Sequence, residues 1–346
     1  MSRPAVSGTG PWPGADVLEA QTVVVGDLQD IPAEVAGLPF TVTLAARGPW
    51  SDRVGQAVAL LAELPAELGA HGWKLADHPG RDLGRAQAFG REDLDALAVA
   101  AHGWTGSLVV PVLGPMTLAA SLYLSRGDRV VSDVGAVRAL AESLAAGIGE
   151  HLAAIGRAVP GATPTVLLHE PLLAQVMAGV LPSFSGYSAL RSIPGPVAAE
   201  RLGTLAATVR SAGAASVVVH GGTAWSSLGA IRAAADMGDT VDAFALAVTA
   251  LDDRSWERVA EAVEGGLAFW PELPPQASSQ CAGPDVAGQA DLLLRPWKSV
   301  GLPATGLRDV VLLAGDATGV GSPDDARAVL AGLVRAARIV AERAED

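Results

Sequence analysis

The chain has 346 residues, of which 50% are hydrophobic and 18% charged, with a formal net charge of −13 and a single cysteine. These values exclude a disordered chain, a disulfide framework and a zinc site built from several cysteines. The acidic balance and the absence of Lys/Arg runs argue against a nucleic-acid partner. No apolar run reaches the roughly 18 residues that a membrane span needs. Because the start shows no secretory signal, we expect a cytoplasmic protein.

Predicted strands and helices alternate along the whole chain. After a glycine- and proline-rich start, Asp16 is placed to cap a helix that carries Val17, Ala20 and Leu28 at helical spacing. Short apolar runs predict strands, and amphipathic stretches predict helices. The strands are expected at 40–44, 107–112, 165–168, 217–220, 241–248, 266–270 and 310–313, and the later helices at 51–68, 91–100, 134–158, 196–212, 226–235, 255–264 and 324–345. A first strand within 3–7 would bring the number of strands to eight.

Three segments depart from this alternation. The turn His78-Pro79-Gly80 indicates an excursion from the main repeat near 73–90. The segment 271–283 is rich in Pro, Ser and Gln, contains Cys281 and is expected to be a flexible loop. Pro111 stands inside a predicted strand, which indicates an edge strand or a bulge in a closed barrel.

The alternation predicts the fold class. Eight strands that alternate with helices, without a linker or a break in composition, are typical of a (β/α)₈ TIM barrel, here a single domain over 1–346. An open doubly wound sheet is the alternative. The barrel is favoured because polar residues follow strands along the whole chain and do not gather at one switch point.

Polar residues at strand ends are the candidates for function. The run Val217-Val218-Val219 stops at His220, which two glycines follow, and an earlier apolar run stops at His169-Glu170. Since all parallel strands of a barrel end at one face, these residues are expected to share a site. A strand-end histidine is also common as a hydrogen-bonded structural residue. The residues expected around this mouth are Thr9, Arg47, His169, Glu170, His220, Asp242 and Asp316.

Five short motifs, in order, resemble the catalytic barrel of the cobalamin-independent methionine synthase family. They are Gly8-Thr9-Gly10-Pro11-Trp12-Pro13-Gly14, Val112-Leu113-Gly114-Pro115-Met116-Thr117-Leu118, His169-Glu170-Pro171, His220, and the glycine-rich loop after residue 313. The resemblance covers nearly the whole chain and is strongest to short, single-barrel members of the actinobacterial type. It implies methyl transfer from a methylated folate to a thiol such as homocysteine, in methionine biosynthesis.

The family activates its thiol substrate with zinc held by a histidine, two cysteines and an acidic residue. The resemblance places His220 at the histidine, whereas Gly222 and Thr318 occupy the two cysteine positions, and Asp242 is the nearest candidate for the acidic ligand. Zinc is therefore expected to be weakly bound or absent. A new metal site formed by His169, His220 and Asp242 is an alternative. The resemblance further assigns catalytic roles to His220 and Glu170 and substrate contacts to Ser7, Gly8, Thr9, His169, Glu170, Gly114 and Thr117.

Three functions stay open at this point. The first is a methyltransferase of the methionine-synthase type, and whether the chain is an active enzyme stays undecided. The second is a family member without zinc chemistry that binds a small molecule or a partner protein. The third is a barrel enzyme similar to uroporphyrinogen decarboxylase, against which the scarcity of arginines in the expected substrate loops argues.

Overall fold

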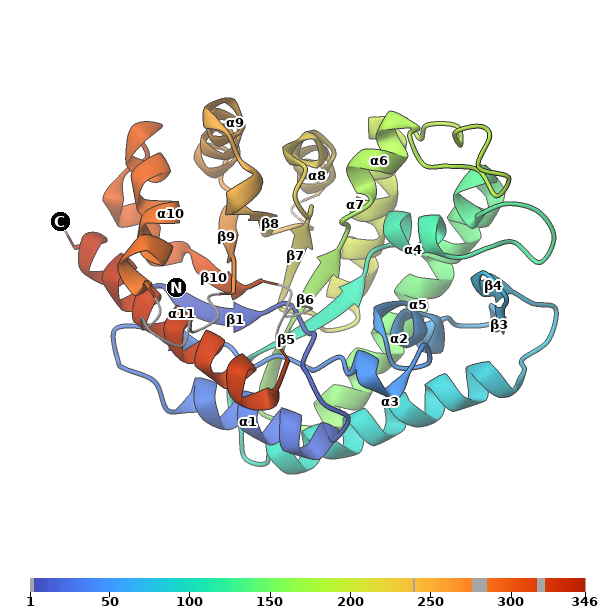
Figure 1. Cartoon of the computed structure of the whole chain (residues 1–346), viewed down its shortest axis with the longest axis horizontal. Coiled ribbons are helices and arrows are strands. Elements are labelled where there is room, and N and C mark those ends of the chain that lie inside the picture. Colours follow the sequence, from blue (N-terminus) through green and yellow to red (C-terminus); the bar gives the residue numbers. More distant parts are fainter. Residues whose placement is uncertain (1–2, 239, 276–284, 316–320, 346) are drawn as a thin grey trace.

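A computed structural model describes residues 3–238, 240–275, 285–315 and 321–345 of the chain. Its parallel strands curl around a central axis with helices outside them, which confirms the (β/α)₈ TIM barrel (Figure 1). The sheet order is β2-β1-β10-β9-β8-β7-β6-β5. The strands are β1 (Ala5–Gly8), β2 (Ala36–Gly37), β5 (Gly106–Leu113), β6 (Ala162–His169), β7 (Ser216–His220), β8 (Ala243–Ala247), β9 (Ala268–Leu273) and β10 (Val311–Ala314).

The helices form the outer layer of the barrel. Their N-termini are often capped by an aspartate, as predicted for Asp16, which accepts a hydrogen bond from the Glu19 N–H at 3.0 Å. The helices are α1 (Val17–Gln29), α2 (Arg53–Leu60), α3 (Arg81–Ala100), α4 (Pro115–Ser121), α5 (Val134–Ala158), α6 (Leu173–Ala178), α7 (Gly195–Ser211), α8 (Leu228–Ala235), α9 (Asp253–Glu264), α10 (Val286–Ser299) and α11 (Pro323–Arg343). The long helix predicted over 134–158 is confirmed at both ends.

The region between α2 and α3 differs from the prediction. The helix expected over 51–68 ends at Leu60, and an antiparallel hairpin of β3 (Ala66–Gly69) and β4 (Gly72–Leu75) follows it. This hairpin lies outside the barrel sheet (Figure 1). The excursion therefore begins before residue 73, and most of the predicted 73–90 segment belongs to the 20-residue helix α3. Pro65 and the alternating run after it indicate the hairpin in retrospect.

The loop expected over 271–283 also starts later than predicted. Pro271, Glu272 and Leu273 belong to β9, in register with Leu246 and Ala247 of β8. The remaining part of this loop, including Cys281, lies outside the described residues.

The barrel has a seam between the segment 38–43 and β5. The predicted strand 40–44 is replaced by the two-residue β2 and by single bridges at Phe40 and Thr43. Among the described residues, two backbone hydrogen bonds cross the seam, from Val109 N–H to Pro39 O at 2.8 Å and from Thr41 N–H to Val109 O at 3.0 Å. In a parallel ladder, every second residue of a strand donates its N–H to the same neighbouring strand. After Val109, the next donor to the segment 39–43 would be residue 111, but Pro111 has no N–H. The ladder therefore stops there.

Two glutamines satisfy the backbone of 40–43 in place of the missing ladder. The Gln21 side chain, on α1, donates to Phe40 O at 2.9 Å and accepts from Val42 N–H at 3.2 Å. The Gln56 side chain, on α2, donates to Val42 O at 3.3 Å and accepts from the Thr43 hydroxyl at 2.7 Å. Since these polar groups are paired without β5, the segment can stand away from the barrel wall.

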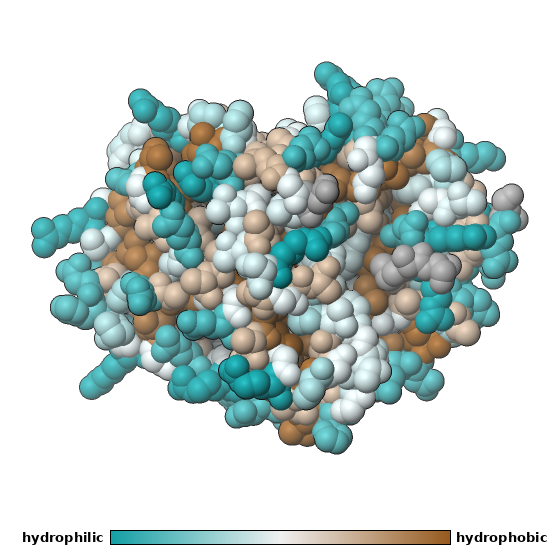
Figure 2. All heavy atoms as spheres, turned by 180° about the vertical axis from the view of Figure 1, so that it is seen from behind, coloured by the Kyte–Doolittle hydropathy of each residue, from teal (hydrophilic) through white to brown (hydrophobic). Residues whose placement is uncertain are grey.

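One continuous hydrophobic core fills the space inside the strands and between strands and helices. The face in Figure 2 is hydrophilic around its outline, with hydrophobic atoms exposed in small separate patches. None of the helices in the described ranges has the length and apolarity to cross a bilayer.

Candidate functional site

The two strand-end histidines lie side by side at the carboxyl-terminal mouth of the barrel. His169 is the last residue of β6 and pairs in register with His220, the last residue of β7. Their ring centroids are 5.1 Å apart, and both side chains are buried. The structure thus brings together two residues that the sequence places 51 positions apart, as expected from the parallel sheet.

Both nitrogens of His220 face protein groups. Nδ1 accepts a hydrogen bond from the backbone N–H of Gly222 at 3.1 Å, so a neutral ring carries its proton on Nε2. Nε2 lies 2.6 Å from a carboxylate oxygen of Glu272, although the N–H is not aligned with this contact as a hydrogen bond. Glu272 therefore lies beside the Nε2 edge of the His220 ring, where it adds a carboxylate to the mouth of the barrel.

Glu272 is a site residue that the sequence interpretation missed. It is the fifth residue of β9, and its side chain is 17% exposed, against 6% for His220. It was assigned to a loop because Pro271 and Pro274 flank it. A single charged residue between Trp270 and Leu273, in an otherwise apolar run, is the signal that could have identified it.

His169 is held in its neutral form. Its Nε2 lies 2.9 Å from the backbone oxygen of Thr9, which fits an N–H donor on that nitrogen. Burial, with smaller contributions from the positive charge of Arg53 and from His220, lowers the pKa of His169 well below its usual value. His169 is therefore uncharged at neutral pH.

Glu170 points away from the two histidines and caps α4. Its carboxylate accepts hydrogen bonds from Met116 N–H at 2.9 Å and from the N–H and hydroxyl of Thr117, both at 2.7 Å. Burial raises the pKa of Glu170 to about 7, and these three hydrogen bonds oppose the rise. The carboxylate approaches Gly114 so closely that a Cβ on this glycine would lie 2.3 Å from Glu170 Oε1. Glu170, Gly114 and Thr117 thus form one buried unit, and direct contact of these residues with a ligand stays a prediction.

The residues predicted at the end of β1 are built into the barrel wall. The Ser7 hydroxyl is buried and donates to Leu38 O at 2.8 Å, and Gly8 lies against the ring of Phe40. Thr9 follows them, and its carbonyl accepts from both His169 and Arg53. Among these three residues, Thr9 is the one with polar contacts to the strand-end histidines.

Asp242 does not lie at the mouth, which corrects the sequence prediction. It precedes β8, and its N–H bonds to Val217 O at the opposite end of the barrel. Its carboxylate pairs with Arg210 and accepts from Val217 N–H at 2.7 Å and Ser216 Oγ at 3.1 Å. Even in the predicted strand 241–248 it stands near the beginning, and the beginnings of parallel strands lie at the end of the barrel opposite the mouth. A metal site made of His169, His220 and Asp242 is therefore excluded.

The remaining residues predicted at the mouth are Arg47, Asp316 and the two positions, 222 and 318, where the family has cysteines. Arg47 pairs with Asp93 and bonds to Ser51 at 2.8 Å, so it ties the start of α2 to α3. Gly222 has a positive φ of 70° and offers its N–H to His220. Thr318 and Asp316 lie outside the described residues.

The described residues do not form a zinc site. No group of three or more His, Cys, Asp or Glu side chains in the described ranges is arranged to hold a metal ion. At the mouth, His220 and Glu272 supply two donors, whereas zinc sites in proteins use three or four protein ligands. Weak or absent zinc binding stays a prediction.

The chain was compared with known families, sequences and structures. No protein-family model matches it, and no curated protein sequence matches it. It is similar in structure to a B12-independent methionine synthase from Shewanella sp. W3-18-1 in complex with selenomethionine, with a TM-score of 0.58 and 12% identity over 97% of both chains. A GH113 beta-1,4-mannanase overlaps with a TM-score of 0.43 and 11% identity, over 99% of this chain and 98% of the other. At 12% identity the likeness to the methionine synthase concerns the fold alone, and the fold resembles that of cobalamin-independent methionine synthase.

Proposed function

We propose that the protein binds a small amino-acid-like or thiol-bearing molecule at the mouth of the barrel, beside His220 and Glu272. The observation that carries this proposal is the cluster of His169, His220 and Glu272 at the ends of β6, β7 and β9. Two neighbouring imidazoles and a carboxylate at the mouth of a TIM barrel form the type of polar cluster that binds small molecules there.

The charges of the cluster favour a ligand with an ammonium group. His169 is neutral, and Glu272 is more exposed than His220, so a ligand at the mouth meets a carboxylate first. A carboxylate attracts an ammonium group by a charge-assisted hydrogen bond. Glu272 thereby takes the role that the sequence interpretation gave to Glu170.

Calorimetric titration with homocysteine, methionine and a methylated folate, each with and without zinc, tests the proposal. We expect zinc-independent binding of an amino acid, weakened about 10- to 100-fold in Glu272→Gln, because a hydrogen bond to a charged group contributes about 1.5–3 kcal/mol. Asp242→Asn, at the other end of the barrel, is the matched control and should bind normally. If the folded protein binds none of the three compounds, the proposal is wrong.

Methyl transfer from a methylated folate to a thiol is the second candidate function. The full-length structural likeness to a methionine synthase favours it. His220, at the position where the family's thiol-activating histidine is expected, and Glu272 beside it would contact the thiol substrate at the mouth. Mass spectrometry of a mixture of protein, methylated folate and homocysteine should detect methionine, and His220→Ala should abolish its formation. Binding of homocysteine without formation of methionine would reject methyl transfer and retain the proposed binding function.

A further inference from the structure

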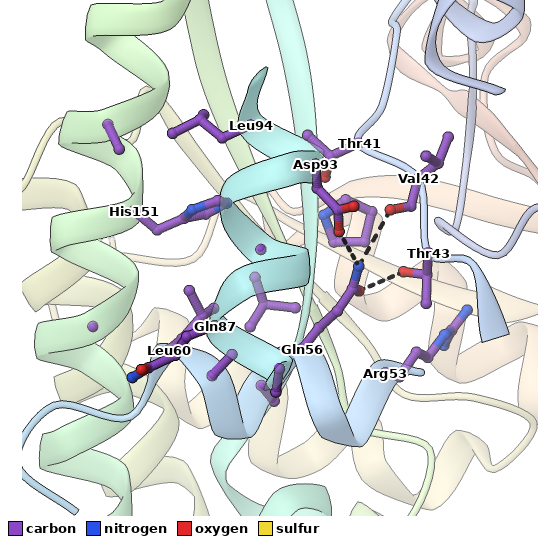
Figure 3. Close-up of a pocket in the computed structure, with 18 of the residues that line it drawn as sticks. Thr41, Val42, Thr43, Arg53, Gln56, Leu60, Gln87, Asp93, Leu94 and His151 are labelled. Atoms are coloured by element: carbon purple, nitrogen blue, oxygen red, sulfur yellow. Dashed lines mark hydrogen bonds between the residues drawn. The ribbon is translucent and has the colours of Figure 1, made fainter. Parts of the chain in front are cut away.

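A cavity of about 450 Å³ lies beside the barrel, outside the seam. Its walls are the segment Thr41–Thr43, the end of β5 from Pro111 to Leu113, and the facing sides of α2, α3 and α5 (Figure 3). The volume falls within the roughly 300–1,000 Å³ of sites for small organic molecules. His169 lines the inner end of the cavity and separates it from His220 and Glu272.

The cavity exists because the seam opens at Pro111. Beyond Val109 the ladder to 39–43 is interrupted, and Gln56 binds the backbone of Val42 and the side chains of Thr43 and Asp93 (Figure 3). On the other side, Gly147 of α5 approaches so closely that a Cβ there would lie 1.5 Å from Leu60 O. The hydrogen bonds of Gln56 hold one side of the cavity in place, and the close packing of Gly147 against Leu60 holds the other.

Slightly more than half of the wall is apolar. The aliphatic residues that line it come from α2, α3, α5 and β5, and no aromatic ring other than imidazole contributes. Such a wall favours an aliphatic or ring-shaped hydrocarbon body over a strongly hydrated molecule. The larger of these residues are Leu60, Leu94, Leu97, Val112 and Leu113.

Two polar side chains in the cavity wall lack a partner. His151 extends from α5 into the cavity (Figure 3), and neither its ring nor the amide of Gln87 hydrogen bonds to any residue in the described ranges. Burial lowers the pKa of His151 to about 4, so the ring is neutral at pH 7 and offers one N–H donor and one nitrogen acceptor. Both side chains are half-buried and line the cavity, so they are free to hydrogen bond to a molecule bound there.

The charges around the cavity balance. Among the residues that line it, Arg53 and Arg91 are positive and Asp93 and Glu150 are negative. Arg91 and Glu150 are exposed and belong to the outer rim. A ligand with a net charge therefore gains little electrostatic attraction from this wall, whereas removing it from water costs free energy.

We propose that this cavity is a second binding site, separate from His220 and Glu272, for an uncharged small molecule with an apolar body and one hydrogen-bonding group. The apolar body lies against Leu60, Leu94 and Leu97, and a hydroxyl, amide or amine group bonds to His151. The proposal stands independently of any amino-acid or thiol binding at the mouth of the barrel.

Fluorescence titration with 1-aminoanthracene tests the site. This probe is an uncharged three-ring amine at neutral pH, and anthracene-2-carboxylate has the same ring system with a negative charge. We expect saturable binding of the amine to one site per chain, with the carboxylate at least about tenfold weaker. Tighter binding of the carboxylate would overturn the proposed ligand class, and the absence of saturable binding by either probe would overturn the site.

Matched variants locate the probe. Ala154→Phe, on α5, and Ala59→Phe, on α2, each place a ring in the cavity and should weaken binding at least about tenfold by filling it. Ala153→Phe, at an exposed neighbouring position outside the cavity, is the control and should bind as the unaltered protein does. His151→Leu should weaken the amine more than it weakens anthracene itself. Melting temperatures show which variants fold, and unchanged binding in the two folded cavity variants would disprove the location.

Discussion

At the scale of single residues, Gly114 and Glu170 are fitted to each other. The glycine begins the turn into α4, and the carboxylate occupies the space that a side chain on it would need. The sequence predicted both residues as site residues from their motifs. It could not reveal that they contact each other, because 56 positions separate them and the contact depends on the pairing of β5 with β6.

Gly114→Ala should destabilise the protein by about 1–3 kcal/mol, since the new methyl group displaces the Glu170 carboxylate from its three hydrogen bonds. Gly84→Ala is the matched control, because a Cβ on this exposed residue of α3 has no atom within 4 Å. It should raise stability by about 0.5–1 kcal/mol, as expected for Gly to Ala in a helix. Urea unfolding of both variants gives the comparison. Equal effects in the two would contradict the fit of Gly114 to Glu170.

His151 should make stability depend on pH. Its folded-state pKa of about 4 lies below the ordinary value of 6.5, so the unfolded chain takes up a proton first, and stability falls as the pH drops from 6.5 towards 4. Between pH 7 and pH 5 the unaltered protein should lose up to about 2 kcal/mol more than His151→Leu does. Denaturant unfolding at the two pH values measures this. Parallel losses in both proteins would show that His151 is accessible to protons when folded.

At the scale of elements, a residue reaches the site when it stands at the carboxyl-terminal end of its strand. His169 and His220 end β6 and β7 and were predicted there, because apolar runs that stop at a histidine mark the end of a strand clearly. Asp242 was misplaced because it was selected as the nearest acidic residue, although it stands at the beginning of its strand and so at the opposite end of the barrel. Glu272 was placed in a loop because the predicted strand ended at residue 270, three residues before β9 ends.

Asp242→Ala should lower stability by about 1–3 kcal/mol, since it leaves the Val217 N–H and Arg210 without their acceptor. Ligand binding at the mouth should not change, because Asp242 lies at the opposite end of the barrel. Thermal unfolding and calorimetry of the same sample measure both effects. A loss of binding without a loss of stability would contradict this placement of Asp242.

At the scale of the whole molecule, the alternation of strands and helices sufficed to predict the barrel. The hairpin of β3 and β4 was not predicted, although its signal is local, because the run was assigned to the preceding helix. The seam was not predicted because it depends on contacts between distant segments. The seam in particular depends on Gln21 and Gln56, whose side chains replace ladder hydrogen bonds, and no local pattern indicates this.

Purified protein should contain less than one zinc ion per chain. The chain has one cysteine, and the described residues at the mouth contribute His220 and Glu272, a donor set that releases zinc readily. Elemental analysis after dialysis against a chelator measures the content. One tightly held zinc per chain would mean that further residues complete a site.

A TIM barrel is normally a continuous ring, but in the described part of this one the ladder is interrupted between the segment 39–43 and β5. The two hydrogen bonds that Val109 makes with the segment 39–41 are the backbone link across that interruption in the described residues. The join between β6 and β7, in contrast, runs in register over five residue pairs. Breathing of the barrel should therefore concentrate along one line. Amide hydrogen exchange should be faster at Thr41 and Val109 than at Val217 and Val219.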